Sequence, residues 1–141
     1  MQYIPKRSKF KKFHKGKKLF KLKNNFNPLY LTASVALKAV EPGRLTSKKL
    51  YVLKQSINKI IKKKGKNYIK IFPMIGVSKK PKEIRMGKGK GAVDRWVCKI
   101  KAGVILCEIF VLSNSAGLKA LKLVQKKLPF QTKIVKKLIS I

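Results

Sequence analysis

Alternating glycines and lysines stand at residues 85–91, where the sequence reads RMGKGKG. Glycine-rich runs with a lysine bind nucleotide phosphates when they follow the pattern GxxxxGK and then Ser or Thr, on a strand-to-helix turn. Here Ala92 and Val93 follow the run, the next stretch has the pattern of a strand, and no acidic residue is placed to hold Mg²⁺. A nucleotide-binding P-loop is therefore not expected.

The same residue types suit a different contact with phosphate. Glycine has no Cβ, so its backbone can approach a phosphate closely, and Arg85, Lys88 and Lys90 supply positive charge. A folded RNA surface that excludes larger side chains would fit such a loop. The alternative is a flexible basic linker, and composition alone leaves the two interpretations nearly even.

Residues 5–28 combine a dense basic run with interleaved phenylalanines. The phenylalanines stand at positions 10, 13, 20 and 26. Aromatic side chains within a basic run favour an arm that docks on RNA over a solvated tail. We therefore expect residues 1–28 to form an extended, basic RNA-binding arm.

The net charge limits the partners of the chain. It is +33 at pH 7, with 37 basic residues against four acidic ones. Because such a chain would repel itself at low salt, a polyanion is expected in its normal environment, and nucleic acid is the commonest. An anionic membrane is the rival, but no apolar run approaches the ~20 residues that span a bilayer. No membrane insertion is expected.

Few residues could carry catalysis or bind a metal. A zinc site needs about four ligands at suitable spacing, and the residues available offer no plausible acid–base pair or triad. They are Glu41, Glu83, Asp94, Glu108, His14, Cys98 and Cys107. We expect no enzymatic activity, no catalytic residue, no metal and no cofactor, and we expect the two cysteines to pack as free thiols.

The apolar pattern predicts an α+β fold for residues 29–141. One compact domain is expected, with a mixed or antiparallel sheet packed against two amphipathic helices. The first helix should begin at an N-cap, Thr46, and end at a C-cap, Gly65; the second should cover 113–128. Strands are expected at 29–40, 68–72, 92–100, 104–110 and 130–135.

A β-hairpin is expected from the two strands that flank a turn at Ala102 and Gly103. Its register would set Trp96, Cys98 and Ile100 opposite Ile109, Cys107 and Ile105, so that the apolar faces match. The two cysteines would then be near neighbours across the strands. Residues 74–91 contain Gly, Ser and Pro and are expected to form an exposed loop.

Five segments, in order along nearly the whole chain, resemble the universal large-subunit ribosomal protein L-sixteen family, with its archaeal and eukaryotic L-ten-e relatives. The run RMGKGKG before a Trp-Val strand is highly specific. The segments are PKRSKFKKFHKG at 5–16, LKAVEPGRLTSKKL at 37–50, KGKNYIKIFP at 64–73, KPKEIRMGKGKGAVDRWVCKIKAGVILCEI at 80–109 and LKLVQKKLPFQTKIV at 121–135.

The resemblance implies a structural protein that binds large-subunit rRNA near the base of the central protuberance. Such proteins lie beside the A-site tRNA and neighbouring large-subunit proteins, and they join late in subunit assembly. The loop implied to extend toward the peptidyl-transferase centre and tRNA contains Ser78, Lys79, Lys80, Pro81 and Lys82. The expected rRNA-binding residues are Lys6, Arg7, Lys9, Lys11, Lys12, His14, Lys15, Arg44, Arg85, Gly87, Lys88, Gly89, Lys90 and Gly91.

Two alternatives concern the function and the compartment. A free nucleic-acid-binding protein, such as a nucleoid protein, fits the charge, although no helix-turn-helix reader is evident. Lysine supplies 33 of the 37 basic residues, which indicates an AT-rich genome because lysine codons are A-rich. With no apolar signal segment at the N-terminus, we expect a ribosome in the mitochondrial matrix, with a plastid or an AT-rich bacterial cytoplasm as alternatives.

Overall fold

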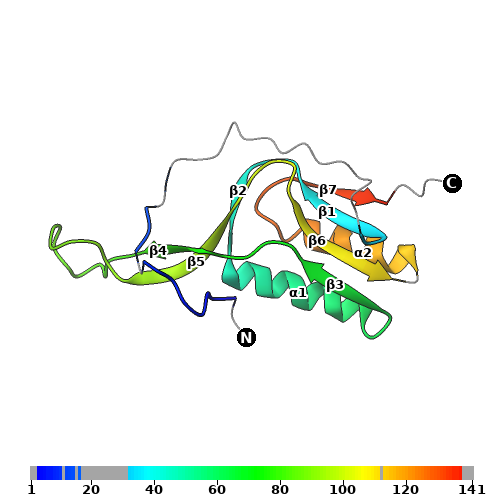
Figure 1. Ribbon diagram of the computed structural model, residues 1–141, viewed down its shortest axis with the longest axis horizontal. Coiled ribbons are helices and arrows are strands. Elements are labelled where there is room, and N and C mark those ends of the chain that lie inside the picture. The colour runs from blue at the N-terminus through cyan, green and yellow to red at the C-terminus, as the bar shows by residue number, and fades with distance from the viewer. Residues whose placement is uncertain (1–2, 11, 15, 17–31, 112, 138–141) are drawn as a thin grey trace.

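The described residues form two antiparallel sheets and two helices (Figure 1). The computed structural model describes residues 3–10, 12–14, 16, 32–111 and 113–137. Within these ranges, one sheet has the strand order β3-β6-β1-β7 and the other has the order β2-β5-β4. The elements are β1 (Val35–Ala39), β2 (Gly43–Thr46), α1 (Ser47–Ile61), β3 (Gly65–Ile69), β4 (Ile75–Ser78), β5 (Val93–Ile100), β6 (Ile105–Val111), α2 (Asn114–Gln125) and β7 (Thr132–Lys136).

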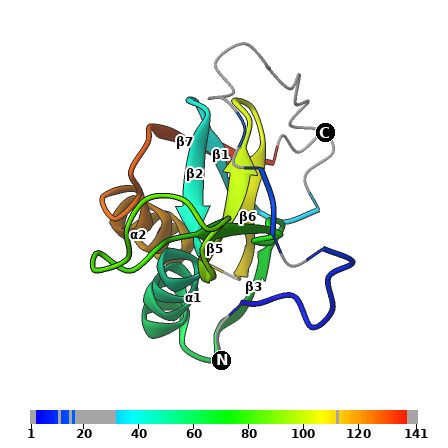
Figure 2. The ribbon, with the colours of Figure 1, turned by 90° about the vertical axis from the view of Figure 1, so that its left-hand side faces the viewer.

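The main core lies between the four-stranded sheet and the two helices, which pack together on one face of it (Figure 2). Alternate residues of β1 point into this core because side chains along a strand face opposite sides. Val35, Leu37 and Ala39 are fully buried there. This confirms the α+β class and the strand predicted within 29–40, although residues 29–31 lie outside the described ranges.

Helix α1 begins as predicted and ends earlier. The Thr46 hydroxyl accepts a hydrogen bond from the Lys49 backbone N–H at 3.4 Å, as an N-cap does. The helix ends at Ile61, and Lys62 (φ 53°) donates its N–H to the Asn58 carbonyl at 2.8 Å. The predicted C-cap at Gly65 is therefore wrong. Gly65 begins β3, where a Cβ would lie 2.3 Å from the Phe110 carbonyl oxygen of β6.

Helix α2 is shorter than the predicted span of 113–128, since it ends at Gln125. Its buried face includes Leu121, Val124, Gly117 and Ala120. These small residues let the helix approach the sheet closely: a Cβ on Gly117 would lie 2.9 Å from a Val35 methyl carbon. The last predicted strand is confirmed as β7.

Strands β5 and β6 do not pair with each other, so the predicted hairpin is wrong. Instead β5 pairs with β2 and β4, and β6 pairs with β1 and β3. Between them, Gly103 (φ +90°) donates its N–H to the Ala39 carbonyl at 2.7 Å, and Ala39 donates to the Val104 carbonyl at 2.9 Å. This turn is thereby bonded to the end of β1, and the chain crosses from one sheet to the other.

The two cysteines are free and buried, but they lie on strands of different sheets. Cys98 is opposite Leu45 of β2, and Cys107 is opposite Leu37 of β1. The expectation of cross-strand neighbours is therefore wrong. Burial raises the pKa of both thiols. It raises that of Cys107 to about 12, with a smaller contribution from the charge of Glu108.

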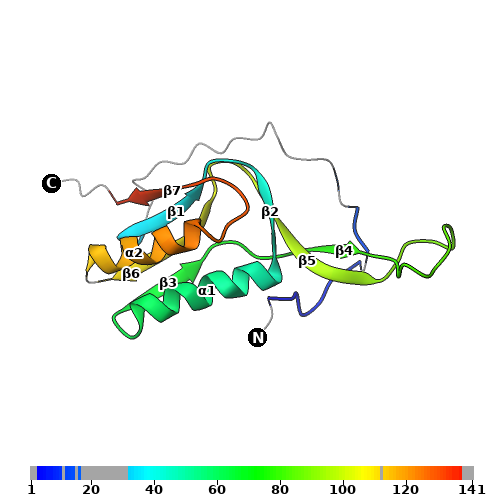
Figure 3. The ribbon, with the colours of Figure 1, turned by 180° about the vertical axis from the view of Figure 1, so that it is seen from behind.

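The predicted exposed loop 74–91 contains a strand. Residues 75–78 form β4, which pairs with β5 and makes a hairpin that extends away from the helices (Figure 3). The irregular loop at the end of this hairpin consists of residues 79–92, which form neither helix nor strand. The strand expected at 68–72 lies at Gly65–Ile69.

The buried face of α2 gives a stability prediction. Leu121 is fully buried, so Leu121→Ala should lower the free energy of unfolding by about 2–5 kcal/mol. Leu123, on the same helix, is 38% exposed, so Leu123→Ala should cost less than about 1 kcal/mol. Urea unfolding followed by Trp96 fluorescence measures both values. Equal losses for the two variants would mean that the buried face of α2 is misassigned.

Candidate nucleic-acid interface

The loop at the end of the β4–β5 hairpin projects away from the helices (Figure 1), and most of its residues are exposed to solvent. All residues from 81 to 90 are exposed, and they include Lys82, Arg85, Lys88 and Lys90. Met86 is fully exposed as well. An exposed basic loop at the end of a projecting hairpin can reach a surface that the rest of the domain does not touch.

The glycines of this loop have two different roles. Gly87 and Gly89 have positive φ angles, +101° and +80°, which L-residues rarely adopt. Among the described residues, apart from the adjoining ones in the chain, none has an atom within 4 Å of a Cβ built on either glycine, so the space beside both is open there. At Gly91 a Cβ would lie 2.5 Å from the Lys79 carbonyl oxygen, so this glycine allows the two sides of the loop to meet at its base.

Lysines also organise the loop from within. The Lys80 ammonium donates a hydrogen bond to the Gly87 carbonyl oxygen across the loop. At the base, the Lys79 N–H donates to the Ala92 carbonyl at 3.0 Å. Lys80 is therefore partly used in holding the loop, while Lys79, Pro81 and Lys82 are exposed and Ser78 is half-buried at the end of β4.

The basic arm is docked on the same hairpin. The Phe13 ring packs edge-on against the Trp96 ring of β5, with centroids 6.2 Å apart. The Lys12 ammonium donates to the Lys90 carbonyl oxygen at 2.5 Å, and the Lys90 ammonium donates to the Phe13 carbonyl oxygen. Two segments separated by about 80 positions in sequence therefore form one surface.

Further contacts hold both ends of the described arm. At its start, the Tyr3 ring packs edge-on against Phe72, with centroids 6.4 Å apart. At its end, the Gly16 carbonyl oxygen accepts a hydrogen bond from the Arg44 guanidinium at 2.8 Å. Arg44 is opposite Lys99. Because side chains alternate along β5, Lys99 and Trp96 are on opposite faces, so the arm contacts both faces of this sheet.

Besides the loop residues described above, Arg85, Lys88, Lys90 and Gly91, the predicted binding residues in the described ranges divide into three groups. Arg44 and Lys12 hold the arm in place through the contacts described above, and Gly87 and Gly89 shape the loop. Lys6, Arg7, Lys9 and His14 are exposed along the arm, which has neither helix nor strand at its described positions. Lys11 and Lys15 lie outside the described residues.

Sequence reasoning missed Lys99 and the aromatic partner of the arm, Trp96. A signal for Lys99 was present: Arg95, Lys99 and Lys101 stand at odd positions and share one face of an extended strand. A Cβ on Gly16 would lie 2.7 Å from the Lys99 ammonium nitrogen, which places this lysine beside the arm.

Other site types find little support in the described ranges. No three residues of the His, Cys, Asp and Glu types gather there. No helix in the same ranges is long and apolar enough to cross a membrane. The arm and the hairpin loop form a basic, exposed surface in the described ranges, and an extended anion would fit it.

Comparison with known proteins decides the family. The model of the family described as "Ribosomal protein L16p/L10e" matches residues 5–135, which include the arm, the hairpin loop and both helices. The chain belongs to this family of ribosomal proteins. Its members are structural components of the ribosome, so membership supports a structural role rather than a catalytic one.

Three bacterial relatives, each named "Large ribosomal subunit protein uL16", match over almost their full lengths. The protein of Paracoccus denitrificans is 43% identical, with 93% of this chain and 94% of the relative covered. That of Maricaulis maris is 42% identical, with 95% and 96% covered. That of Psychrobacter arcticus is 41% identical, with 96% and 97% covered.

The Phe13–Trp96 contact predicts how firmly the arm is held. Phe13→Ala removes this contact, so trypsin should cleave the arm after Lys6, Lys9 and Lys12 several-fold faster than in the wild type, because a released arm enters the protease more often. Phe10→Ala is the matched control, since Phe10 is 63% exposed, and its cleavage rate should equal that of the wild type. Similar rates for all three proteins would show that Phe13 does not hold the arm.

Proposed function

We propose that this chain is a structural constituent of the large ribosomal subunit that binds large-subunit rRNA through its arm and its hairpin loop. The observation that carries the proposal is the contact between Lys12 of the arm and Lys90 of the loop, which joins the two basic segments into one surface. Membership of a ribosomal protein family supports RNA over DNA, and it argues against a free nucleoid protein.

Phosphate can replace the present partners of these lysines. Lys12 and Lys90 donate to neutral backbone carbonyls in the protein alone. Hydrogen bonds between two charged groups are shorter and stronger, so a phosphate oxygen is the better partner for an ammonium group. In this proposal, rRNA phosphates take the place of these carbonyl oxygens as the partners of the two lysines.

The loop suits a close approach to rRNA. The open space beside Gly87 and Gly89 is space that an RNA backbone can occupy without meeting a side chain. Arg85 and Lys88 flank these glycines with charge. In this proposal Gly91 acts indirectly, because it allows the loop to close on Lys79.

We extend the proposal to tRNA. The hairpin carries Ser78, Lys79, Lys80, Pro81 and Lys82 away from the body of the domain (Figure 3), and we propose that this segment helps position A-site tRNA near the peptidyl-transferase centre. Joining the subunit late in assembly fits a protein whose loop must enter rRNA that is already folded. Its partners would be large-subunit rRNA, A-site tRNA and neighbouring large-subunit proteins.

We also propose that the ribosome is mitochondrial. The support is compositional: lysine supplies 33 of the 37 basic residues, as A-rich codons favour, and compact AT-rich genomes are found in organelles. A plastid or an AT-rich bacterium would show the same bias. Sedimentation of the chain with large subunits from purified mitochondria decides between these compartments.

Salt dependence tests the contribution of phosphate contacts. Replacing Lys6, Lys9 and Lys12 together by Gln should make the slope of log K against log salt shallower by roughly two to three units. The variant neutralises fewer phosphates, so its binding releases fewer counterions. Filter binding of the full chain to large-subunit rRNA measures it. The control replaces Lys59, Lys62 and Lys63, near the end of α1, and should leave the slope nearly unchanged. Equal slopes for both triple variants would contradict a specific role of the arm.

Gly89 separates two reasons for a glycine in the loop. Asn adopts positive φ more readily than other residues that carry a side chain, so Gly89→Asn preserves the backbone shape but fills the open space. If rRNA occupies that space, both Gly89→Asn and Gly89→Val should strongly reduce incorporation into large subunits. The thermal stability of the free protein should change little for Gly89→Asn and should fall more for Gly89→Val, because a β-branched residue is strained at this positive φ.

Tagged variants expressed in cells and quantified in sedimented large subunits provide the measurement. The wild type serves as the reference, in whichever compartment its subunits are found. If Gly89→Asn incorporates normally and Gly89→Val does not, only the backbone angle matters. Normal incorporation of both variants would contradict a close approach of rRNA to Gly89, and the loop would then act as a basic spacer.

A further inference from the structure

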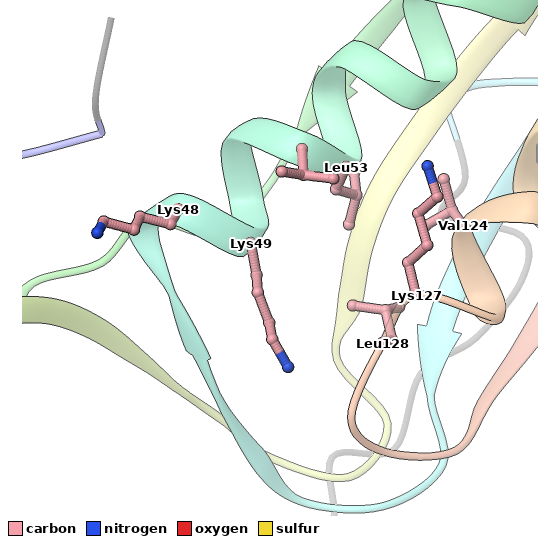
Figure 4. Close-up of a pocket in the computed structure, with 7 residues that line it drawn as sticks. Lys48, Lys49, Leu53, Val124, Lys127 and Leu128 are labelled. Atoms are coloured by element: carbon pink, nitrogen blue, oxygen red, sulfur yellow. The ribbon is translucent and has the colours of Figure 1, made fainter.

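A groove lies between the first half of α1 and the C-terminal end of α2, apart from the hairpin and its loop (Figure 4). Its volume is about 360 Å³. Leu53 and Val124, which are almost fully buried, form its floor. Val52, which is 44% exposed, and Leu128, which is half-buried, line its sides.

Lysines surround this apolar floor. Lys127 lies just beyond the end of α2, and its side chain reaches α1, where its ammonium donates a hydrogen bond to the Ser56 hydroxyl at 2.7 Å. Lys49 extends along the groove toward Leu128, and Lys48 points away from it (Figure 4). Among the described residues that line the groove, none carries a carboxylate.

The lining selects among possible occupants. Every apolar residue in it is Val or Leu, and none is aromatic. A single-stranded RNA base is usually held by stacking on an aromatic ring or an Arg plane, which this groove lacks. A free phosphate could bind the lysines but would leave the floor exposed to water. An aliphatic side chain flanked by carboxylates uses both the floor and the lysines.

The chain itself supplies few such carboxylates. Glu108 is buried, accepts a hydrogen bond from the Thr32 hydroxyl at 2.5 Å and pairs with Lys70 at 3.5 Å. Glu41 accepts from the Gln131 backbone N–H at 3.4 Å on another part of the surface. The other two acids, Glu83 and Asp94, are exposed in the hairpin loop and on β5, so a segment that carries several carboxylates has to come from another polypeptide.

We infer that this groove docks an acidic segment of a different protein, which places an aliphatic side chain on Leu53 and Val124 and carboxylates near Lys49 and Lys127. The inference goes beyond the proposed function, because it concerns a protein partner and a surface on the helices rather than RNA on the hairpin. Its outcome does not depend on whether the arm and loop bind rRNA.

The test uses the full chain labelled at its Val and Leu methyl groups and observed by NMR. The probe is a synthetic peptide with one leucine between pairs of glutamates, and the matched probe has alanine in place of leucine. The leucine peptide should shift the methyl signals of Val52, Leu53, Val124 and Leu128 and should bind roughly tenfold more tightly than the alanine peptide, because only leucine buries an apolar side chain.

Protein variants locate the binding. Val52→Ser and Lys49→Gln should each weaken the leucine peptide about threefold or more. Their matched controls, Leu123→Ser on α2 and Lys59→Gln on α1, change exposed residues that do not line the groove and should leave affinity unchanged. Equal affinity for the two peptides would mean non-specific charge attraction and would overturn the inference. So would a uridine oligonucleotide of equal charge that shifted the same methyl signals, since the groove would then bind RNA.

Discussion

Strand β5 fixes the position of the hairpin loop and of the arm that docks beside it. At one end, Cys98 and Ile100 are buried in the main core and pair with β2. At the other end, the same strand pairs with β4 and leads out to the loop. Because β5 runs without a break from the core to the loop, the packing of the core determines where the loop stands. Phe13 packs against Trp96, midway along this strand, so β5 also fixes the position of this part of the arm.

Charge and apolar packing are divided between parts of the structure. The helices and the four-stranded sheet enclose the buried aliphatic residues, while the arm and loop carry exposed lysines with little apolar burial of their own. The four acids cannot offset 37 basic residues. One of them, Glu108, already pairs with Lys70. Self-repulsion therefore opposes compactness in the free protein, and any polyanion that binds only the folded chain stabilises it.

The sequence indicated the faces of elements and the start of α1 better than it indicated which strands pair. Thr46 and the apolar stripe of α1 were predictable because capping and periodicity are local. β2 and β4 were missed because four residues show too little alternation, and β4 lies in a stretch rich in Gly and Lys. The β5–β6 error has a general cause: a period of two identifies the apolar face of a strand, but any strand with a matching face can be its neighbour. Likewise the basic arm and loop were predictable from composition, whereas the contact between Lys12 and Lys90 depends on the tertiary fold.

The docking of the arm has a consequence for how fast and how tightly a ligand is captured. A tail that is free in solution loses backbone and side-chain entropy when it binds, and this loss subtracts from affinity. Here much of that loss has already occurred on folding, since Tyr3, Phe13 and Gly16 are held against the domain. A ligand therefore meets a preorganised surface, and association depends on orientation and electrostatic attraction more than on a search among chain conformations.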